Sequence, residues 1–155
     1  MAIKTMLIYF LCITAGIVIG GYLFSRSQPR SLLSINRCED CMSRKDLYGL
    51  LASAAIQRIP GTIPFIIFET DKTIAVKLPS KKTHFHYVIF PKKDIKNIGE
   101  LGEEDSSYLT DAFLVARHII EKEKLTRYVM FTNGPDKQDV TYLHFHLVDD
   151  INQQQ

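Results

Sequence analysis

The sequence has almost no excess of charge, few cysteines and no internal repeats. Its 19 Lys and Arg residues are nearly balanced by 17 Asp and Glu residues, and a net charge of +2 is too small to indicate nucleic-acid binding. Of its three cysteines, only Cys38 and Cys41 are closely spaced. With 155 residues, the chain has room for one domain of ordinary size.

The N-terminal region contains a long run without any charged residue. Met6 to Phe24 are 19 consecutive uncharged residues, which as a helix would span about 28 Å, close to the hydrocarbon thickness of a bilayer. A secretory signal peptide is the alternative, but its apolar stretch is usually shorter and ends at a small-x-small cleavage site. This run has no such site, so we expect residues 1–25 to be a retained transmembrane anchor.

Basic residues on both sides of this run bear on its orientation. Lys4 precedes the run, whereas Arg26, Arg30 and Arg37 follow it. Because positively charged flanking residues favour the cytoplasmic side, this distribution favours a domain in the cytoplasm. We therefore expect a single-pass membrane protein with its domain on that side.

The rest of the chain shows helix-like and strand-like patterns in turn. Apolar residues at helical spacing predict a short helix over 46–59 and a long one from 105 or 106 to about 125. We predict strands over 65–68, 73–76, 86–90, 128–132 and 142–148. Strands, one long helix and two further strands together indicate an α+β fold.

These patterns divide the chain into four parts. After the anchor, residues 26–59 form a linker that contains the cysteine pair and the short extra helix, which packs against the domain or against a partner. Residues 60–150 form the domain, and we expect residues 151–155 to be a disordered tail.

Two histidines near the C-terminus alternate with apolar residues. In a strand, Tyr142, His144 and His146 would share one face, and the apolar residues between them would share the other. Neutral imidazole is a nucleophile and a general base near neutral pH, so this pattern suits a catalytic site. A strand with two histidines satisfied in the core is the alternative interpretation.

This segment resembles the signature of the histidine-triad (HIT) family, in which three alternating histidines precede apolar residues. The approach from Gln138 to His144 is similar to that of the family, and Asn133 begins a segment that resembles its Asn-Gly loop. The stretch from His86 through Pro-Lys-Lys resembles a strand and turn of the family, and residues 68–76 resemble its first hairpin. Together these matches cover about residues 60–150.

The resemblance implies a fold and an activity. The fold would be a HIT-like five-stranded antiparallel sheet with one long helix. The activity would be attack on a phosphate of a nucleotide derivative, with His144 as the nucleophile. The substrate and its phosphate oxygens would be bound by His146, Asn133, Gln138 and Tyr142. Of these, Tyr142 would stand where the family has its first histidine.

The resemblance also bears on a metal. Some family members hold a structural zinc with a cysteine pair and two histidines, so Cys38, Cys41 and His86 are candidate ligands. The second histidine would correspond to Tyr142, and a phenolate is a rare zinc ligand. A disulfide or two free thiols remain as alternatives, and no cofactor is required for the chemistry.

Two functions follow from this comparison. The first is a membrane-anchored hydrolase or nucleotidyl transferase that acts on a nucleotide or, as in a membrane-bound branch of the family, on a nucleotide-lipid. The second is a catalytically degenerate subunit of a membrane complex, which is motivated by Tyr142 and by Leu78, where many family members have a ribose-binding acid. The expected partners are a nucleotide ligand, the membrane, and a second copy or a complex subunit.

Overall fold

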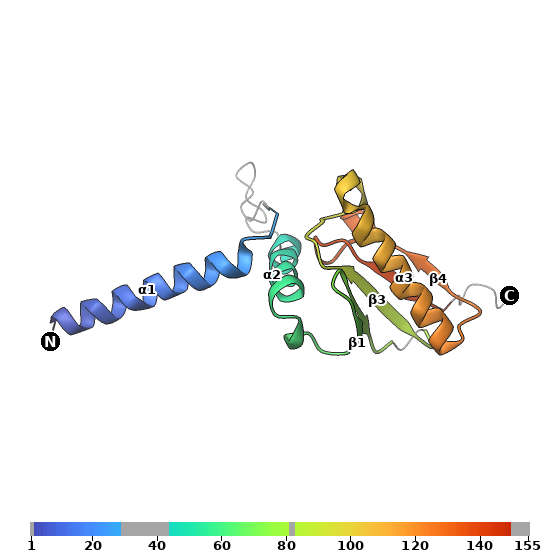
Figure 1. Cartoon of the computed structure of the whole chain (residues 1–155), viewed down its shortest axis with the longest axis horizontal. Helices are drawn as coiled ribbons and strands as arrows, with labels where there is room; N and C mark the ends of the chain where they lie inside the picture. Colours follow the sequence, from blue (N-terminus) through green and yellow to red (C-terminus); the bar gives the residue numbers. More distant parts are fainter. Residues whose placement is uncertain (1, 29–43, 81–82, 150–155) are drawn as a thin grey trace.

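A computed structural model of the chain describes residues 2–28, 44–80 and 83–149. Helix α1 (Ala2–Phe24) leads away from a body that contains α2 (Arg44–Arg58), a sheet and α3 (Ser106–Glu123), as Figure 1 shows. The cysteine pair and the predicted tail over 151–155 lie outside the described residues.

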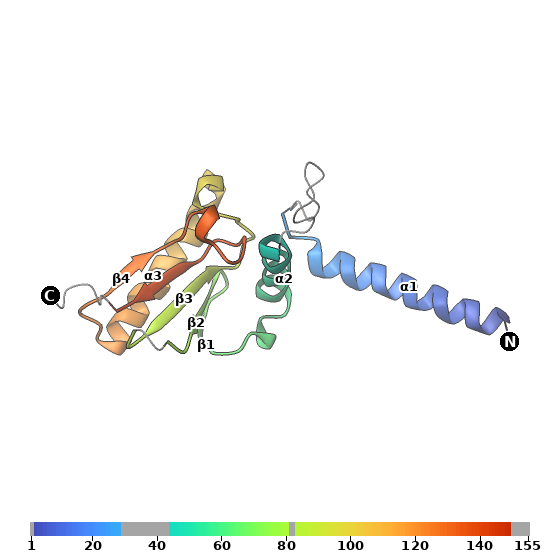
Figure 2. The ribbon, with the colours of Figure 1, turned by 180° about the vertical axis from the view of Figure 1, so that it is seen from behind.

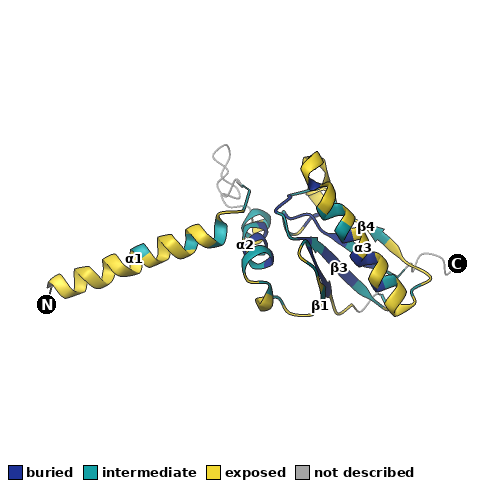
Figure 3. Cartoon of the chain, viewed as in Figure 1, coloured by how far each residue is buried: buried dark blue, intermediate teal, exposed yellow. Residues whose placement is uncertain are grey.

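Helix α1 is apolar and is not covered by the rest of the protein (Figure 3). The stretch Ile3–Phe24 is long and apolar enough to cross a membrane, and none of it is buried inside the structure. A signal sequence near the N-terminus would share these properties. The helix was expected from the uncharged run, and its role as an anchor stays a prediction.

The sheet has five strands, which pair in the order β1-β2-β3-β5-β4. They are β1 (Ile66–Glu69), β2 (Thr73–Lys77), β3 (His86–Pro91), β4 (Val129–Phe131) and β5 (Phe145–Val148). Every neighbouring pair is antiparallel. The predicted α+β class and the five-stranded antiparallel sheet are therefore confirmed.

Helix α3 covers one face of the sheet, and Figure 2 shows the sheet in front of it. Its inward residues recur at helical spacing, so that Ala112, Val115 and Ile119 are buried. They pack against the alternate strand residues that point to the same side, such as Tyr87 and Leu147. This is the larger part of the core.

Helix α2 packs on the opposite face of the sheet, which we call the α2 face. Ile56 of this helix is 4% exposed and joins Ile74, Val76 and Val88 in a second buried cluster. The predicted short helix is therefore present, and it packs against the domain rather than lying free in a linker. The histidines of the candidate site, described below, also lie on the α2 face.

Strand β5 begins three residues later than the sequence predicted, because it starts at Phe145 rather than Tyr142. Its partner β3 ends at Pro91, which has no N–H to continue the ladder. The backbone N–H of Leu143 instead donates to the carbonyl of Ile95 at 2.6 Å. His144 consequently stands at the entrance of the strand rather than within it.

Candidate functional site

His144 is held just before β5 by a local hydrogen bond. Its Nδ1 lies 2.7 Å from the carbonyl oxygen of Tyr142, which can only accept, so Nδ1 carries the proton. Nε2 of the neutral ring therefore keeps its lone pair. Burial lowers the pKa of His144, against the opposing effects of the Tyr142 carbonyl and of Asp139. The ring is thus neutral near pH 7 and has one nucleophilic nitrogen.

His146 lies on β5 at the centre of a group of rings. Its ring stacks on Phe131 with centroids 4.9 Å apart and meets the edge of His144 at 4.8 Å. Burial, together with the charges of His144 and His86, lowers the pKa of His146 to about 4, although Asp139 acts in the other direction. His146 is therefore neutral over the whole physiological pH range.

His86, which begins β3, is hydrogen bonded to His146. Its Nε2 lies 2.9 Å from Nδ1 of His146, so one of these two nitrogens carries the shared proton. Burial first, and then His144, lowers the pKa of His86. The pairing follows from sheet register, because His86 lies opposite Val148, two residues beyond His146 on the same face. This bond fixes the orientation of the His146 ring.

Tyr142 is fully buried on the α2 face, where it packs with Ile74 and Val88. Its hydroxyl donates to the carbonyl oxygen of Pro91 at 2.7 Å. Its own carbonyl accepts from His144. In this arrangement the phenol joins the segment before β5 to the end of β3, and the backbone of the same residue orients the candidate nucleophile.

The loop between β4 and β5 carries two candidate amides, and one of them lies at a histidine. Nδ2 of Asn133 lies 3.5 Å from Nε2 of His146. Gln138 is only 1% exposed, and its Nε2 has no hydrogen-bond partner among the described residues. An unpaired buried N–H group is costly, so this donor is suited to a ligand that supplies an acceptor.

Helix α2 holds this loop in place. The backbone N–H and the hydroxyl of Thr141 both donate to the carbonyl of Lys45, each at 3.2 Å. The ammonium of Lys45 in turn donates to the carbonyl of Asp136 at 3.2 Å. The first turn of α2 therefore fixes the segment that carries Gln138 and leads to His144.

The two lysines after β3 have structural partners. Lys92 forms an ion pair with Glu69 at 2.6 Å, which joins the end of β3 to the end of β1. Lys93 pairs with Asp105 at the start of α3, and the hydrogen bond to Asp105 raises the pKa of this lysine. Both ammonium groups are therefore paired with carboxylates outside the histidine cluster.

Only one of the three predicted zinc ligands, His86, is among the described residues. Cys38 and Cys41 lie outside the described residues, and Nε2 of His86 is bonded to His146. Among residues 2–28, 44–80 and 83–149, no group of three metal-binding side chains comes together. The zinc site therefore stays a prediction.

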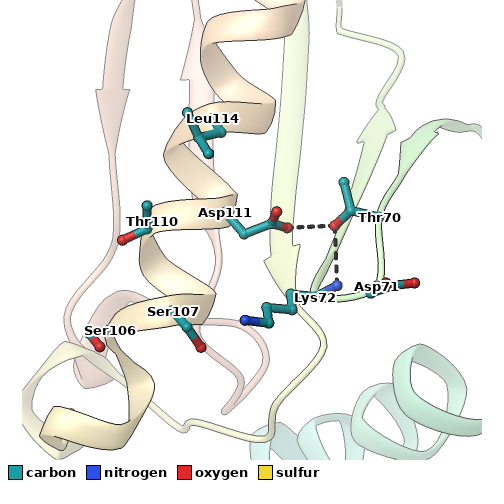
Figure 4. A pocket seen from close by; sticks show the side chains of 8 residues that line it. All are labelled: Thr70, Asp71, Lys72, Ser106, Ser107, Thr110, Asp111 and Leu114. Atoms are coloured by element: carbon teal, nitrogen blue, oxygen red, sulfur yellow. Dashed lines mark hydrogen bonds between the residues drawn. The ribbon is translucent and has the colours of Figure 1, made fainter.

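A hollow of about 490 Å³ lies away from the histidines, between the β1–β2 turn and the start of α3 (Figure 4). Thr70, Lys72 and Asp111 are among the residues that line it, and the Thr70 hydroxyl donates to the Asp111 carboxylate at 2.5 Å. This hollow is on the α3 side of the sheet. The polar groups there bond to one another, so it is a weaker candidate than the histidine cluster.

Sequence reasoning grouped His144, His146, Asn133, Gln138 and Tyr142 as one site. The structure shows direct contacts of His146 with His144 and with Asn133, whereas the Tyr142 hydroxyl is bonded to the Pro91 carbonyl. Sequence reasoning did not foresee the bond from His86 to His146, nor Phe131 stacked on His146. Side-chain alternation along β3, which puts His86 and Val88 on one face, was the signal available in the sequence. Predicting the bond to His146 also requires the register between β3 and β5.

Comparison with known proteins identifies relatives over the same region. The model of the family described as scavenger mRNA decapping enzyme C-term binding matches residues 55–155. An uncharacterized 13.1 kDa HIT-like protein from Mesomycoplasma hyorhinis is 31% identical over 86 residues, which are 54% of this chain and 78% of that protein.

Solved structures share the fold. The HIT family hydrolase from Clostridium thermocellum is 27% identical with a TM-score of 0.57, over 64% of this chain and 91% of that one. The HIT family hydrolase from Legionella pneumophila is 27% identical with a TM-score of 0.54, over 59% and 87%. The histidine triad nucleotide-binding protein from Candida albicans is 26% identical with a TM-score of 0.51, over 61% and 73%.

Proposed function

The chain belongs to the family described as scavenger mRNA decapping enzyme C-term binding and is HIT-like. From this membership we propose that it binds a nucleotide derivative and attacks one of its phosphates through His144. The observation that carries the proposal is the hydrogen bond from Nδ1 of His144 to the Tyr142 carbonyl, which leaves Nε2 as a nucleophile. Structural relatives that are named hydrolases and a nucleotide-binding protein support the proposed class of reaction.

The proposed reaction proceeds in two steps. The lone pair on Nε2 of His144 forms a P–N bond, and the P–O bond to the leaving group breaks. Water then attacks the phosphorus, the P–N bond breaks and the imidazole recovers its lone pair. The net change is addition of water across the P–O bond, with one proton passing to the leaving oxygen. No metal is needed for this chemistry.

Three neighbouring groups support the phosphate in this proposal. Gln138 supplies its unpaired buried N–H, and Asn133 supplies a second amide. When His86 donates to Nδ1 of His146, the proton of His146 is on Nε2 and becomes a third donor. Such preorganised donors stabilise negative charge as it develops on the phosphate oxygens.

We also propose that α1 anchors the protein in a membrane, with the domain on the cytoplasmic side. Its length, its apolar composition and its complete lack of burial in the structure support this. An anchored enzyme meets substrates at the bilayer surface, which favours an amphiphilic substrate such as a nucleotide-lipid.

The alternative function is that of an accessory subunit with a reduced site. The Tyr142 hydroxyl is bonded to a backbone carbonyl in the core, and Leu78, 38% exposed, follows β2 next to His86. A subunit of this kind would leave the membrane together with stoichiometric partners after detergent extraction. A monodisperse protein with turnover would contradict it.

The test is turnover and binding across nucleoside phosphoramidates, dinucleotides and CDP-lipids. Wild type is compared with His144→Ala and with His118→Ala, which removes an exposed imidazole on α3 far from the site. We expect turnover in wild type and in His118→Ala, and loss of turnover in His144→Ala. Equal turnover in all three proteins, or none with any substrate, would overturn the proposed mechanism.

A further inference from the structure

Helix α2 carries an exposed apolar stripe that the domain does not cover. Tyr48, Leu51 and Ile59 are 52%, 50% and 43% exposed. With 3.6 residues per turn, Tyr48, Leu51 and the half-buried Ala55 fall within about 60° of one another around α2. Ile59 directly follows the helix, and its N–H still donates to the carbonyl of Ala55. The side that packs on the sheet, which includes Ile56, is a different one. We call Tyr48, Leu51, Ala55 and Ile59 the outer stripe.

The end of α1 is attached to α2. The guanidinium of Arg58 lies over the Tyr22 ring at 4.5 Å and donates to the Ser25 hydroxyl at 2.5 Å. The hydroxyls of Ser27 and Ser53 are 2.8 Å apart. These contacts hold the C-terminal end of α1 against α2.

One further bond connects the same segment to the domain. The backbone N–H of Gln28 donates to the buried carboxylate of Asp94 at 2.7 Å. The chain from α1 is therefore held at α2 and at the turn after β3. A bilayer crossed by α1 would consequently have its surface beside α2.

The outer stripe adjoins this junction. Leu51 and Arg58 are seven residues apart, about two helical turns, so they lie on the same side of α2. Arg58 itself contacts Tyr22 and Ser25, so this side of α2 meets the end of α1.

The residues around the stripe are those that favour a lipid surface. Arg26 is exposed just after α1, Arg44 is exposed at the first residue of α2, and Asp46 is the one carboxylate within α2. Tyrosine is enriched at membrane interfaces, and Arg side chains are attracted to anionic headgroups. Helices with an apolar face and basic residues lie in the plane of the interface.

We propose that the outer stripe of α2 rests in the headgroup layer of the membrane that α1 spans, so that the domain lies on the bilayer surface. This inference rests on the proposed anchorage and does not depend on catalysis. The partner is a lipid surface, and the second contact fixes the orientation of the domain in addition to its attachment.

The absence of tryptophan makes a direct test available. The full chain is reconstituted into vesicles with brominated phosphatidylcholine, which quenches tryptophan only on contact. Single tryptophans are introduced by Tyr48→Trp in the stripe, Phe10→Trp in α1 and Tyr128→Trp as the matched control. Tyr128 is 42% exposed and precedes β4, on the side of the sheet away from α1 in Figure 1.

We expect loss of fluorescence in Phe10→Trp and Tyr48→Trp, and none in Tyr128→Trp. Quenching at Phe10→Trp without quenching at Tyr48→Trp overturns the inference and leaves the anchorage intact. No quenching at Phe10→Trp overturns both. A Tyr48→Trp emission that is blue-shifted but not quenched would mean that protein covers the stripe, which also overturns the inference. Leu51→Trp repeats the test at a second stripe position.

Discussion

Acid should destabilise the domain through the histidine cluster, and His146 should account for a measurable part of the effect. In the unfolded chain this histidine titrates near pH 6.5, whereas in the folded protein its pKa is lowered to about 4. Between these values the unfolded state binds more protons than the folded state, so stability falls as the pH falls. The contribution is fully present above pH 6.5 and lost below about pH 4.

The magnitude follows from the size of the shift. A difference of about 2.5 pKa units corresponds to about 3 kcal/mol over the full range, and to about 2 kcal/mol at pH 5. Because His146 is only partly buried, solvent screening reduces this to about 1 kcal/mol at pH 5. Burial lowers the pKa values of His144 and His86 as well, so their loss adds in the same direction.

The assay is denaturant unfolding of the full chain in detergent at pH 7 and pH 5. Wild type is compared with His146→Gln, which keeps a polar side chain that does not titrate, and with His118→Gln as the exposed control. We expect wild type and His118→Gln to lose more free energy of unfolding on acidification than His146→Gln does. An equal loss in all three proteins would refute the reasoning that burial of His146 links protonation to stability.

Three further predictions concern the same face of the sheet. Tyr142→Phe should lower the free energy of unfolding by about 1–3 kcal/mol, because it leaves the Pro91 carbonyl without its donor, and an unchanged denaturation midpoint would contradict this. Ile56→Ala should cost about 2–5 kcal/mol in the same assay, whereas a loss of only a few tenths would mean that α2 is not docked on the sheet. If the protein has turnover, His86→Leu should reduce kcat more than His86→Gln, because only glutamine can still hydrogen bond to His146; equal rates would exclude a positioning role for His86.

The alternation of side chains made much of the fold accessible from sequence. The faces of the segment from Tyr142 to Leu147 were predicted correctly, because burying Leu143 and Leu147 against α3 leaves His146 on the α2 face. The long helix was equally clear, since its apolar residues recur over several turns and one side packs on the sheet. Both are local patterns that the tertiary structure did not override.

Features that depend on strand register or on the packing of small residues could not be predicted from the sequence. Pro91 ends the pairing of β3 with β5, but this matters only once Pro91 is known to lie opposite the residues before β5. The contact of α2 with the domain was not evident, because Gly49 and Ser53 are buried there and neither has a strongly apolar side chain. The bond between His86 and His146 joins residues 60 positions apart in sequence.

Helix α2 connects three parts of the protein that the sequence presents as separate. Its first turn holds the loop that carries Gln138, through the bonds between Lys45 and Thr141. Its middle covers the sheet through Ile56, and its last turn binds the end of α1 through Arg58. The family match begins within this helix, at residue 55, so the last turn of α2 belongs to the matched region. The geometry of the candidate site should therefore be measured with α1 and α2 present, because contacts of α2 reach both the end of α1 and the loop before His144.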